Sequence, residues 1–303
     1  MLSADVERYL ALRQRLGFTL RDAAHRLRAY ARFATARGDT HVRTTTAVDW
    51  AGMAPSPYAR HIRLRDVVKL ARFLQAEDGA HEVPVLATFR HASVRPLPYI
   101  YTPEEIVRLV TAAGRLRATY PLRRPGYTML LGLIASTGLR VSEALDLRIE
   151  DVLPQGVLRI RRAKFSKSRL VPLHATTQEA LDRYLALRTA LAVPDDHVFL
   201  SAAHRRIASS MVSYTFRRVL KLAQIAPDRA RAPRIHDLRH TFATRALERC
   251  SAERRAVSRH FVALSTYLGH IDIKQTYWYL EATPELMADI AAAAEALAGG
   301  GAP

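Results

Sequence analysis

The sequence predicts a mainly α-helical protein with a small β-sheet insertion, divided into two domains. Apolar residues recur at the three- and four-residue spacing of amphipathic helices over most of the 303 residues. Two short runs, 157–162 and 169–173, instead have the composition of strands and are joined by a polar turn, which indicates a hairpin. A stretch with prolines and no clear period, 86–98, indicates a linker between a first domain, 1–85, and a second, 99–303.

The charge of the chain indicates its class of partner. Lys and Arg outnumber Asp and Glu by 46 to 28, which gives a formal net charge of +18. A surface this positive attracts polyanions, and nucleic acid is the leading candidate. The single cysteine, Cys250, excludes an internal disulfide and fits a reducing, cytoplasmic setting. We find neither a signal peptide nor a stretch long and apolar enough to span a membrane.

The first domain is expected to be an all-helical module. Tyr9, Leu12 and Leu16 predict the apolar face of its first helix, and the helical pattern continues to about residue 75. The helices are rich in arginine, which in a protein this positive favours a surface that faces DNA phosphates. Three of these arginines are our candidate DNA contacts: Arg60, Arg63 and Arg65.

The second domain begins at a well-marked helix start. Thr102 is the expected N-cap, Pro103 takes the first helical position and Glu105 completes a capping box. A buried helix at 127–136 is expected to end at Gly138. Further helices are predicted at three places: 177–191, 211–222 and 236–247.

Cations of this domain have the arrangement that a phosphate-binding site requires. Arg140 follows the glycine that ends the preceding helix, so its guanidinium lies at a chain turn, where it can hold a phosphate with two parallel hydrogen bonds. His236 and Arg239 project from one face at the start of a helix, next to the positive end of its dipole. We interpret His240 as structural and as facing away from this pair.

The segment LSTYLGHIDIKQTYWYL places His270 nine residues before Tyr279. A continuous helix would put these two side chains on opposite faces, so we expect a break, with Gly269 ending one helix and Asp272 capping the next. On the second helix Tyr277 falls on the stripe that faces the core. Tyr279 falls off that stripe and can face a substrate.

Four elements therefore follow one another along the chain: TGLR, a basic hairpin turn, HDLRH and the segment just described. In this order they resemble the catalytic set of the tyrosine recombinases, the family of phage integrases and Xer-type resolvases. The resemblance implies six catalytic residues: Arg140, Lys164, His236, Arg239, His270 and Tyr279. It also implies that Glu143, the acid three residues after Arg140, fixes Arg140 in a supporting role. It implies that the tyrosine attacks phosphorus, forms a 3′-phosphotyrosyl bond and needs neither a metal ion nor another cofactor.

The resemblance also assigns the hairpin turn. Lys164 lies 24 residues after Arg140, which is similar to the Xer-type spacing, and we prefer it over Lys167 as the general acid for the leaving 5′-oxygen. Lys167 and Arg169 are then expected to contact DNA phosphates. The basic stretch 254–261 lengthens the chain after HDLRH relative to the Xer pattern, and the sequence leaves its role open.

The family further implies how the protein is organised on DNA. The first domain would be a SAM-like core-binding domain, and a homotetramer would exchange strands between two double-stranded sites through a Holliday junction. An apolar stripe that begins at Leu286 predicts a C-terminal helix. This helix could fold back on its own domain, whereas the family implies that it docks into a neighbouring protomer. We favour a role for a mobile element. Inverted repeats at the target, partner recombinases or accessory proteins, and the direction of the reaction are left open by the sequence.

Two other functions compete with this interpretation. A type IB topoisomerase would share the chemistry but would relax supercoils as a monomer. A DNA-binding regulator could keep the fold without catalysis, although it would have no use for Tyr279. Covalent trapping on a nicked duplex separates the regulator from the two enzymes.

Overall fold

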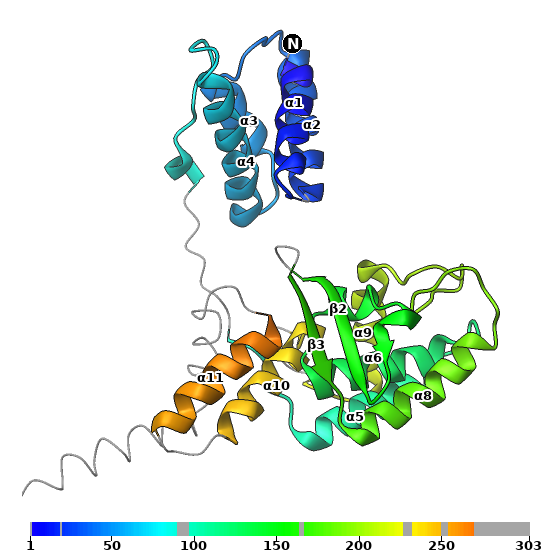
Figure 1. Cartoon of the computed structure of the whole chain (residues 1–303). Helices are drawn as coiled ribbons and strands as arrows, with labels where there is room; N and C mark the ends of the chain where they lie inside the picture. Colours follow the sequence, from blue (N-terminus) through cyan, green and yellow to red (C-terminus); the bar gives the residue numbers. More distant parts are fainter. Residues whose placement is uncertain are drawn as a thin grey trace, which may run out of the picture. The chain divides into compact units, whose positions relative to one another are not determined.

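The computed structural model describes residues 2–18, 20–89, 97–163, 167–226, 232–249 and 254–269 (Figure 1). Contacts within the chain divide it into two compact units, Met1–Arg95 and Pro96–Pro303. Helices and one three-stranded sheet make up the described structure, which confirms the predicted fold class. In the described ranges, no helix has the length and apolar character that crossing a bilayer requires.

The first unit is helical, as predicted. Its helices are α1 (Leu2–Arg15), α2 (Arg21–Ala36), α3 (Thr44–Gly52) and α4 (Pro57–Gln75), followed by the 3-10 helix η1 (Leu86–Phe89). Tyr30 and Trp50 meet edge to face in its core, with ring centroids 5.4 Å apart. The apolar face predicted for the first helix is wrong at two positions, since Leu12 and Leu16 are 40% and 62% exposed. Helix α1 instead packs on α2 and α4 through Leu2, Val6, Tyr9 and Leu10.

A buried ion pair and η1 complete this unit. Asp66 of α4 is only 5% exposed and accepts a 2.8 Å hydrogen bond from Arg26 Nε of α2. Leu86 and Phe89 of η1 pack against the same core, and the Phe89 carbonyl lies 2.9 Å from His61 Nδ1. Residues 86–89, which the sequence placed in the linker, therefore pack with the helices of the first unit.

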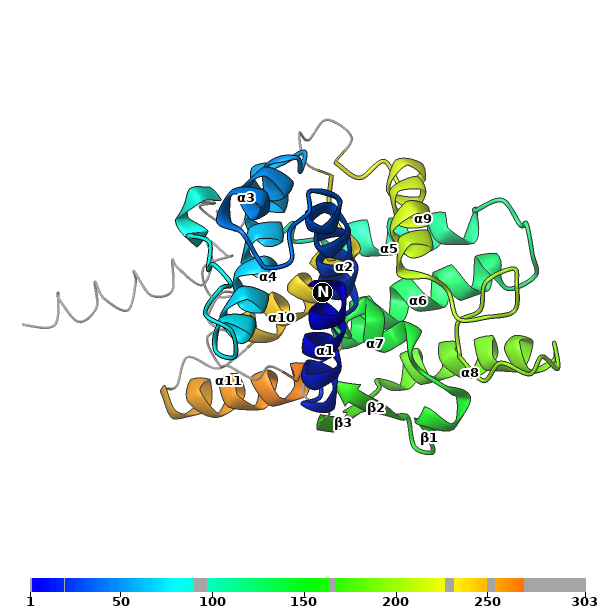
Figure 2. The ribbon, with the colours of Figure 1, turned by 90° about the horizontal axis from the view of Figure 1, so that it is seen from above.

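The second unit is built around helix α6. Its helices are α5 (Pro103–Gly114), α6 (Arg123–Thr137), α7 (Val141–Leu145), α8 (Ala175–Thr189), α9 (Ser209–Leu222), α10 (Ile235–Glu248) and α11 (Arg254–Leu268), with the 3-10 helix η2 (Ile149–Asp151). The predicted capping box starts α5, because Glu105 N–H donates to Thr102 Oγ1 at 3.2 Å and Thr102 N–H donates to Glu105 Oε2 at 3.0 Å. Helix α6 packs against α5, α8 and α10 (Figure 2).

The predicted hairpin forms two strands of an antiparallel sheet, β2 (Val157–Ala163) and β3 (Lys167–Pro172), and a third strand, β1 (Val152–Leu153), extends it in the order β1-β2-β3. Strand β1 was not predicted, because two residues are too short to show a period. Leu158, Ile160 and Val171 face the core. Arg159 and Arg161 alternate with the buried residues of β2, and both donate to the carboxylate of Asp151.

Helices α10 and α11 lie side by side at one end of this unit (Figure 1). They share an apolar cluster that consists of Ala243, Leu247, Phe261, Leu264 and Leu268. His260 of α11 adds a polar contact, with its Nε2 2.7 Å from the carbonyl oxygen of Ala246 in α10. The stretch 254–261, whose role the sequence left open, therefore forms the first half of a helix that packs on α10.

Candidate active site

The candidate site is built on the turn between α6 and α7. Gly138 ends α6 in the left-handed conformation, with φ of 63°, and its N–H donates to Ile134 O at 2.9 Å. Leu139 is buried and anchors the turn, and Arg140 is the N-cap of α7. The structure therefore places Arg140 between two helices, as the sequence predicted, with its side chain 24% exposed.

Glu143 is enclosed by two arginines. Its carboxylate accepts from Arg140 Nη1 at 2.6 Å and from Arg140 N–H at 3.0 Å. It also accepts a pair of hydrogen bonds from Arg169, at 3.0 Å from Nη1 and 2.8 Å from Nη2. Burial alone would raise the pKa of Glu143, but the hydrogen bonds and charge of Arg169, followed by those of Arg140, lower it to about 2. The carboxylate is therefore ionised at neutral pH.

The C-terminal end of α11 meets three guanidinium groups in succession. Arg169 Nε donates to Tyr267 O at 2.8 Å, Arg239 Nη2 donates to Leu268 O at 2.7 Å, and Arg140 Nη2 donates to Gly269 O at 3.1 Å. These carbonyls have no partner inside the helix and carry the negative end of its dipole. Three cations therefore bind the backbone immediately before His270.

Arg239 also connects this end of α11 to the turn after α6. Its side chain is 1% exposed, and its Nη1 donates to Gly138 O at 2.6 Å. Arg140 and Arg239 are thus brought together, as the sequence predicted, with Glu143 beside them. The partly exposed Arg140 and the buried Arg239 have different surroundings, however, and the sequence did not distinguish them.

His236 lies at the first turn of α10, where the sequence placed it. Burial lowers its pKa to about 4, with the charges of Arg239 and Arg234 acting in the same direction. His236 is therefore neutral at pH 7 and does not supply the positive charge that we expected from it. The prediction that His240 faces away was wrong, since the two imidazole rings meet edge to face with centroids 4.7 Å apart. Four residues are about one helical turn, which places both rings on one side of α10.

Arg169 is not placed as the sequence predicted. Its side chain is 11% exposed, and all three of its nitrogen atoms donate to groups of this chain, so we revise its assignment as a DNA contact. A signal for this was present in the hairpin. Arg169 pairs with buried Ile160 and is two residues before buried Val171, and the two-residue period of a strand puts all three on the inner face.

The three arginines expected to contact DNA in the first unit are partly buried in α4. Arg60 Nε donates to Ala54 O at 2.9 Å, and Arg63 Nη1 donates to Trp50 O at 3.2 Å, so both bind carbonyls at the end of α3. Arg65 Nη2 lies 3.3 Å from Asp66 Oδ1, and its side chain is 38% exposed. Arg60 and Arg63 thereby join α4 to the end of α3, and contact of all three arginines with DNA stays a prediction.

Three predicted catalytic residues, Lys164, His270 and Tyr279, lie outside the described residues, as do Tyr277 and the C-terminal helix. Lys167 begins β3, and its side chain is likewise outside the described part. The structure therefore places Arg140, Glu143, His236 and Arg239 of the predicted site.

In the part of the chain that the structure describes, two groups of side chains could hold a metal ion, and neither was predicted. The first group joins residues far apart in the sequence, and the second lies in a polar loop. In the first, His41 Nε2 is 3.1 Å from Asp78 Oδ2, while His81 Nδ1 accepts a hydrogen bond from Val42 N–H at 3.0 Å. That bond uses the lone pair which the His81 nitrogen would need for a metal. We interpret this group as a contact that closes the end of the helical module.

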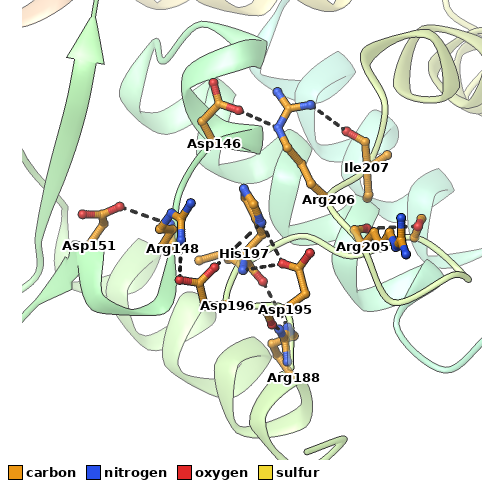
Figure 3. A network of polar contacts seen from close by, with 12 residues as sticks. Asp146, Arg148, Asp151, Arg188, Asp195, Asp196, His197, Arg205, Arg206 and Ile207 are labelled. Atoms are coloured by element: carbon orange, nitrogen blue, oxygen red, sulfur yellow. Dashed lines mark hydrogen bonds and ion pairs between the residues drawn. The ribbon is translucent and has the colours of Figure 1, made fainter. Parts of the chain in front are cut away.

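The second group belongs to a polar network in the second unit (Figure 3). His197 Nδ1 lies 2.7 Å from Asp195 Oδ1, and Asp196 accepts from Arg148 Nη1 at 2.6 Å. The buried Arg188 donates to the carbonyl oxygens of His197 and Asp195. These side chains attach the loop after α8 to η2, which is a structural role.

Comparison with known proteins agrees with this geometry. The chain belongs to the phage integrase family, whose model matches residues 100–285. It is 36% identical over 293 residues to the integrase/recombinase y4rB of Sinorhizobium fredii, covering 93% of each chain. It is 32% identical over 254 residues to the tyrosine recombinase XerD of Brucella abortus, covering 81% of this chain and 78% of XerD. These relatives confirm that the protein is a tyrosine-type site-specific DNA recombinase.

Solved structures share the fold. The Tn1549 transposon integrase, solved in complex with transposon right end DNA, superposes with a TM-score of 0.65 at 18% sequence identity. The match covers 97% of this chain and 99% of that one, so both units have counterparts.

Glycine should be required at position 138, where α6 ends, but not at position 132 inside that helix. A Cβ on Gly138 would lie 2.5 Å from Phe242 Cδ1 and 3.1 Å from Leu268 Cδ2, and φ is 63°. We expect Gly138→Ala to destabilise the protein by about 1–3 kcal/mol. Gly132→Ala is the control, because its Cβ would meet nothing within 4 Å, and alanine favours a helix by up to about 1 kcal/mol. Equal shifts of the urea midpoint for both variants would contradict this account of the turn.

The low pKa of His236 should make stability depend on pH. Its unfolded-state pKa is about 6.5, so the unfolded chain binds a proton first as the pH falls. The contribution of neutral His236 is complete above pH ~6.5 and is lost as the pH falls towards 4. The Tm of His236→Gln should therefore fall less than that of the wild type between pH 7 and pH 4.5. The control is His25→Gln, at an exposed histidine, whose Tm should fall with pH as steeply as that of the wild type. Identical slopes for the wild type and His236→Gln would show that the histidine is not held neutral.

Proposed function

We propose that this recombinase cleaves and rejoins DNA through a covalent bond between Tyr279 and a 3′-phosphate. The observation that carries the proposal is the convergence of Arg140 and Arg239 on the backbone at Leu268 and Gly269, immediately before the segment that holds His270 and Tyr279. Cations from two distant parts of the sequence are thereby gathered next to the nucleophile's segment. The scissile phosphate is expected to bind at this point.

In the proposed cleavage step, Tyr279 Oη forms a bond to phosphorus and the bond from phosphorus to the 5′-oxygen breaks. Lys164 donates its proton to that oxygen, which leaves as a 5′-hydroxyl. The guanidinium groups stabilise the charge that develops on the non-bridging oxygens. The proton that the Tyr279 hydroxyl loses as it attacks passes to His236, which is neutral at pH 7 and can accept it. Because the phosphotyrosyl bond conserves the bond energy, the reverse reaction rejoins the strands.

We further propose that the first and the second unit both bind double-stranded DNA. Four protomers would exchange strands at two sites through a Holliday junction. The net charge of +18 supports affinity for the duplex. The similarity to y4rB and to the Tn1549 transposon integrase supports a role in the movement of a mobile element. Arg60, Arg63, Arg65 and Lys167 are the proposed phosphate contacts, and the C-terminal helix is the proposed contact between protomers.

Covalent trapping tests the nucleophile. On a nicked duplex, in excess EDTA and without nucleotide, the wild type should form a protein–DNA adduct that resists denaturation. Tyr279→Phe should bind the duplex with unchanged affinity and form no adduct, because it lacks the phenolic oxygen that attacks phosphorus. Tyr277→Phe is the matched control and should form the adduct at the wild-type rate.

Four results would contradict the proposal. An adduct with Tyr279→Phe would place the nucleophile elsewhere, and its loss in Tyr277→Phe alone would show that the neighbouring tyrosine attacks. Cleavage that requires Mg²⁺ would indicate the chemistry of a metal-dependent nuclease. Relaxation of supercoiled DNA without recombination between two sites would favour the topoisomerase.

A further inference from the structure

Arg169 is a buried bridge between two parts of the candidate site. One side of its guanidinium holds both oxygens of Glu143, and its Nε holds the Tyr267 carbonyl. Strand β3 is thereby joined to α7 and to the last turn of α11. Arg169 contacts the carboxylate that orients Arg140, so it can act on the site through that group.

The contact with Glu143 reaches Arg140 directly. Glu143 is 7% exposed at its side chain, and its two oxygens are shared between Arg140 and Arg169. Without Arg169 the carboxylate would stay buried with one cation in place of two, which favours a rotated or protonated side chain. Arg140 Nη1 and the N–H at the start of α7 would then lose the fixed acceptor that directs them.

The contact with α11 is equally close. Gly269 has φ of 66°, and a Cβ there would lie 2.9 Å from Arg169 Nη1 and 3.1 Å from its Cζ. The backbone therefore passes against the guanidinium, and only glycine fits in this conformation. Arg169 fixes the carbonyl of Tyr267 while Arg140 fixes that of Gly269, so the two arginines hold adjacent parts of one turn.

We propose that Arg169 is a positioning residue for strand cleavage, which through Glu143 aligns Arg140 and through Tyr267 O anchors the turn that leads to His270 and Tyr279. This role rests on the proposed function, in which Arg140 binds the scissile phosphate. It differs from the role of a DNA contact, because Arg169 acts on the reaction through other protein groups.

The test is single-turnover adduct formation on the nicked duplex at saturating protein. Arg169→Gln should form the adduct about 10- to 100-fold more slowly, since small displacements of a positioned group cost up to about 100-fold in rate. Arg169→Lys, which keeps the charge but cannot bind both Glu143 oxygens and Tyr267 O together, should fall between it and the wild type. Arg183→Gln, at a 73% exposed arginine of α8, removes the same charge and should keep the wild-type rate.

Three further measurements distinguish positioning from binding or from loss of structure. The slope of log K against log[salt] should be unchanged in Arg169→Gln, whereas loss of a phosphate contact would reduce it by about 0.9. The rate of Arg169→Gln should also fall as the pH is lowered from 8 to 5, as Glu143 becomes protonated, while the rate of Arg183→Gln follows the wild type. Melting temperatures of both arginine variants show whether they are folded at the assay temperature.

A double variant gives the decisive comparison. If Arg169 acts partly through Glu143, then Glu143→Gln combined with Arg169→Gln should lose less rate than the product of the two single losses. Rate losses that multiply, or a wild-type rate in Arg169→Gln with a reduced salt slope, would overturn the positioning role and leave the proposed function intact. Failure of the wild type itself to form an adduct would overturn both.

Discussion

The site depends on one buried carboxylate. Glu143 lies in a protein interior where an unpaired charge costs about 3–5 kcal/mol, and it is stabilised by two arginines and a backbone N–H. Two of these groups belong to Arg140, at the turn between α6 and α7, and the other is Arg169 of β3. Because the carboxylate must keep these partners, it fixes β3 relative to this turn.

The end of α11 extends this constraint towards the nucleophile. Its last carbonyls need partners outside the helix, and arginines from β3, α10 and the α7 turn supply them. In the proposed function, the cations that bind the phosphodiester also hold the backbone that leads to His270 and Tyr279. Arg140 and Arg239 would then be structural contacts as well as catalytic groups, and we expect the turn at Gly138 to tolerate little change.

Much of this arrangement was predictable from local sequence. The capping box at Thr102, the end of α6 at Gly138, the hairpin and the start of α10 all follow from signals that act within a few residues, and each is present in the structure. The errors concern burial. The neutral state of His236 and the contact between its ring and His240 depend on packing around α10, and the inward direction of Arg169 depends on strand register. Charge alone suggested a DNA contact for Arg169, because a basic residue beside a basic turn gives no sign of its partner, a buried acid 26 residues earlier.

The most direct test of this account is the titration of the Glu143 carboxyl by ¹³C NMR of glutamate-labelled protein, with Glu143→Gln used to assign the resonance. Two arginines around a buried carboxylate hold its pKa near 2, so the resonance should show no protonation shift between pH 7 and pH 4. A midpoint near the ordinary value of 4.5 would show that the carboxylate is not enclosed by Arg140 and Arg169, and would contradict the organisation of the site described above.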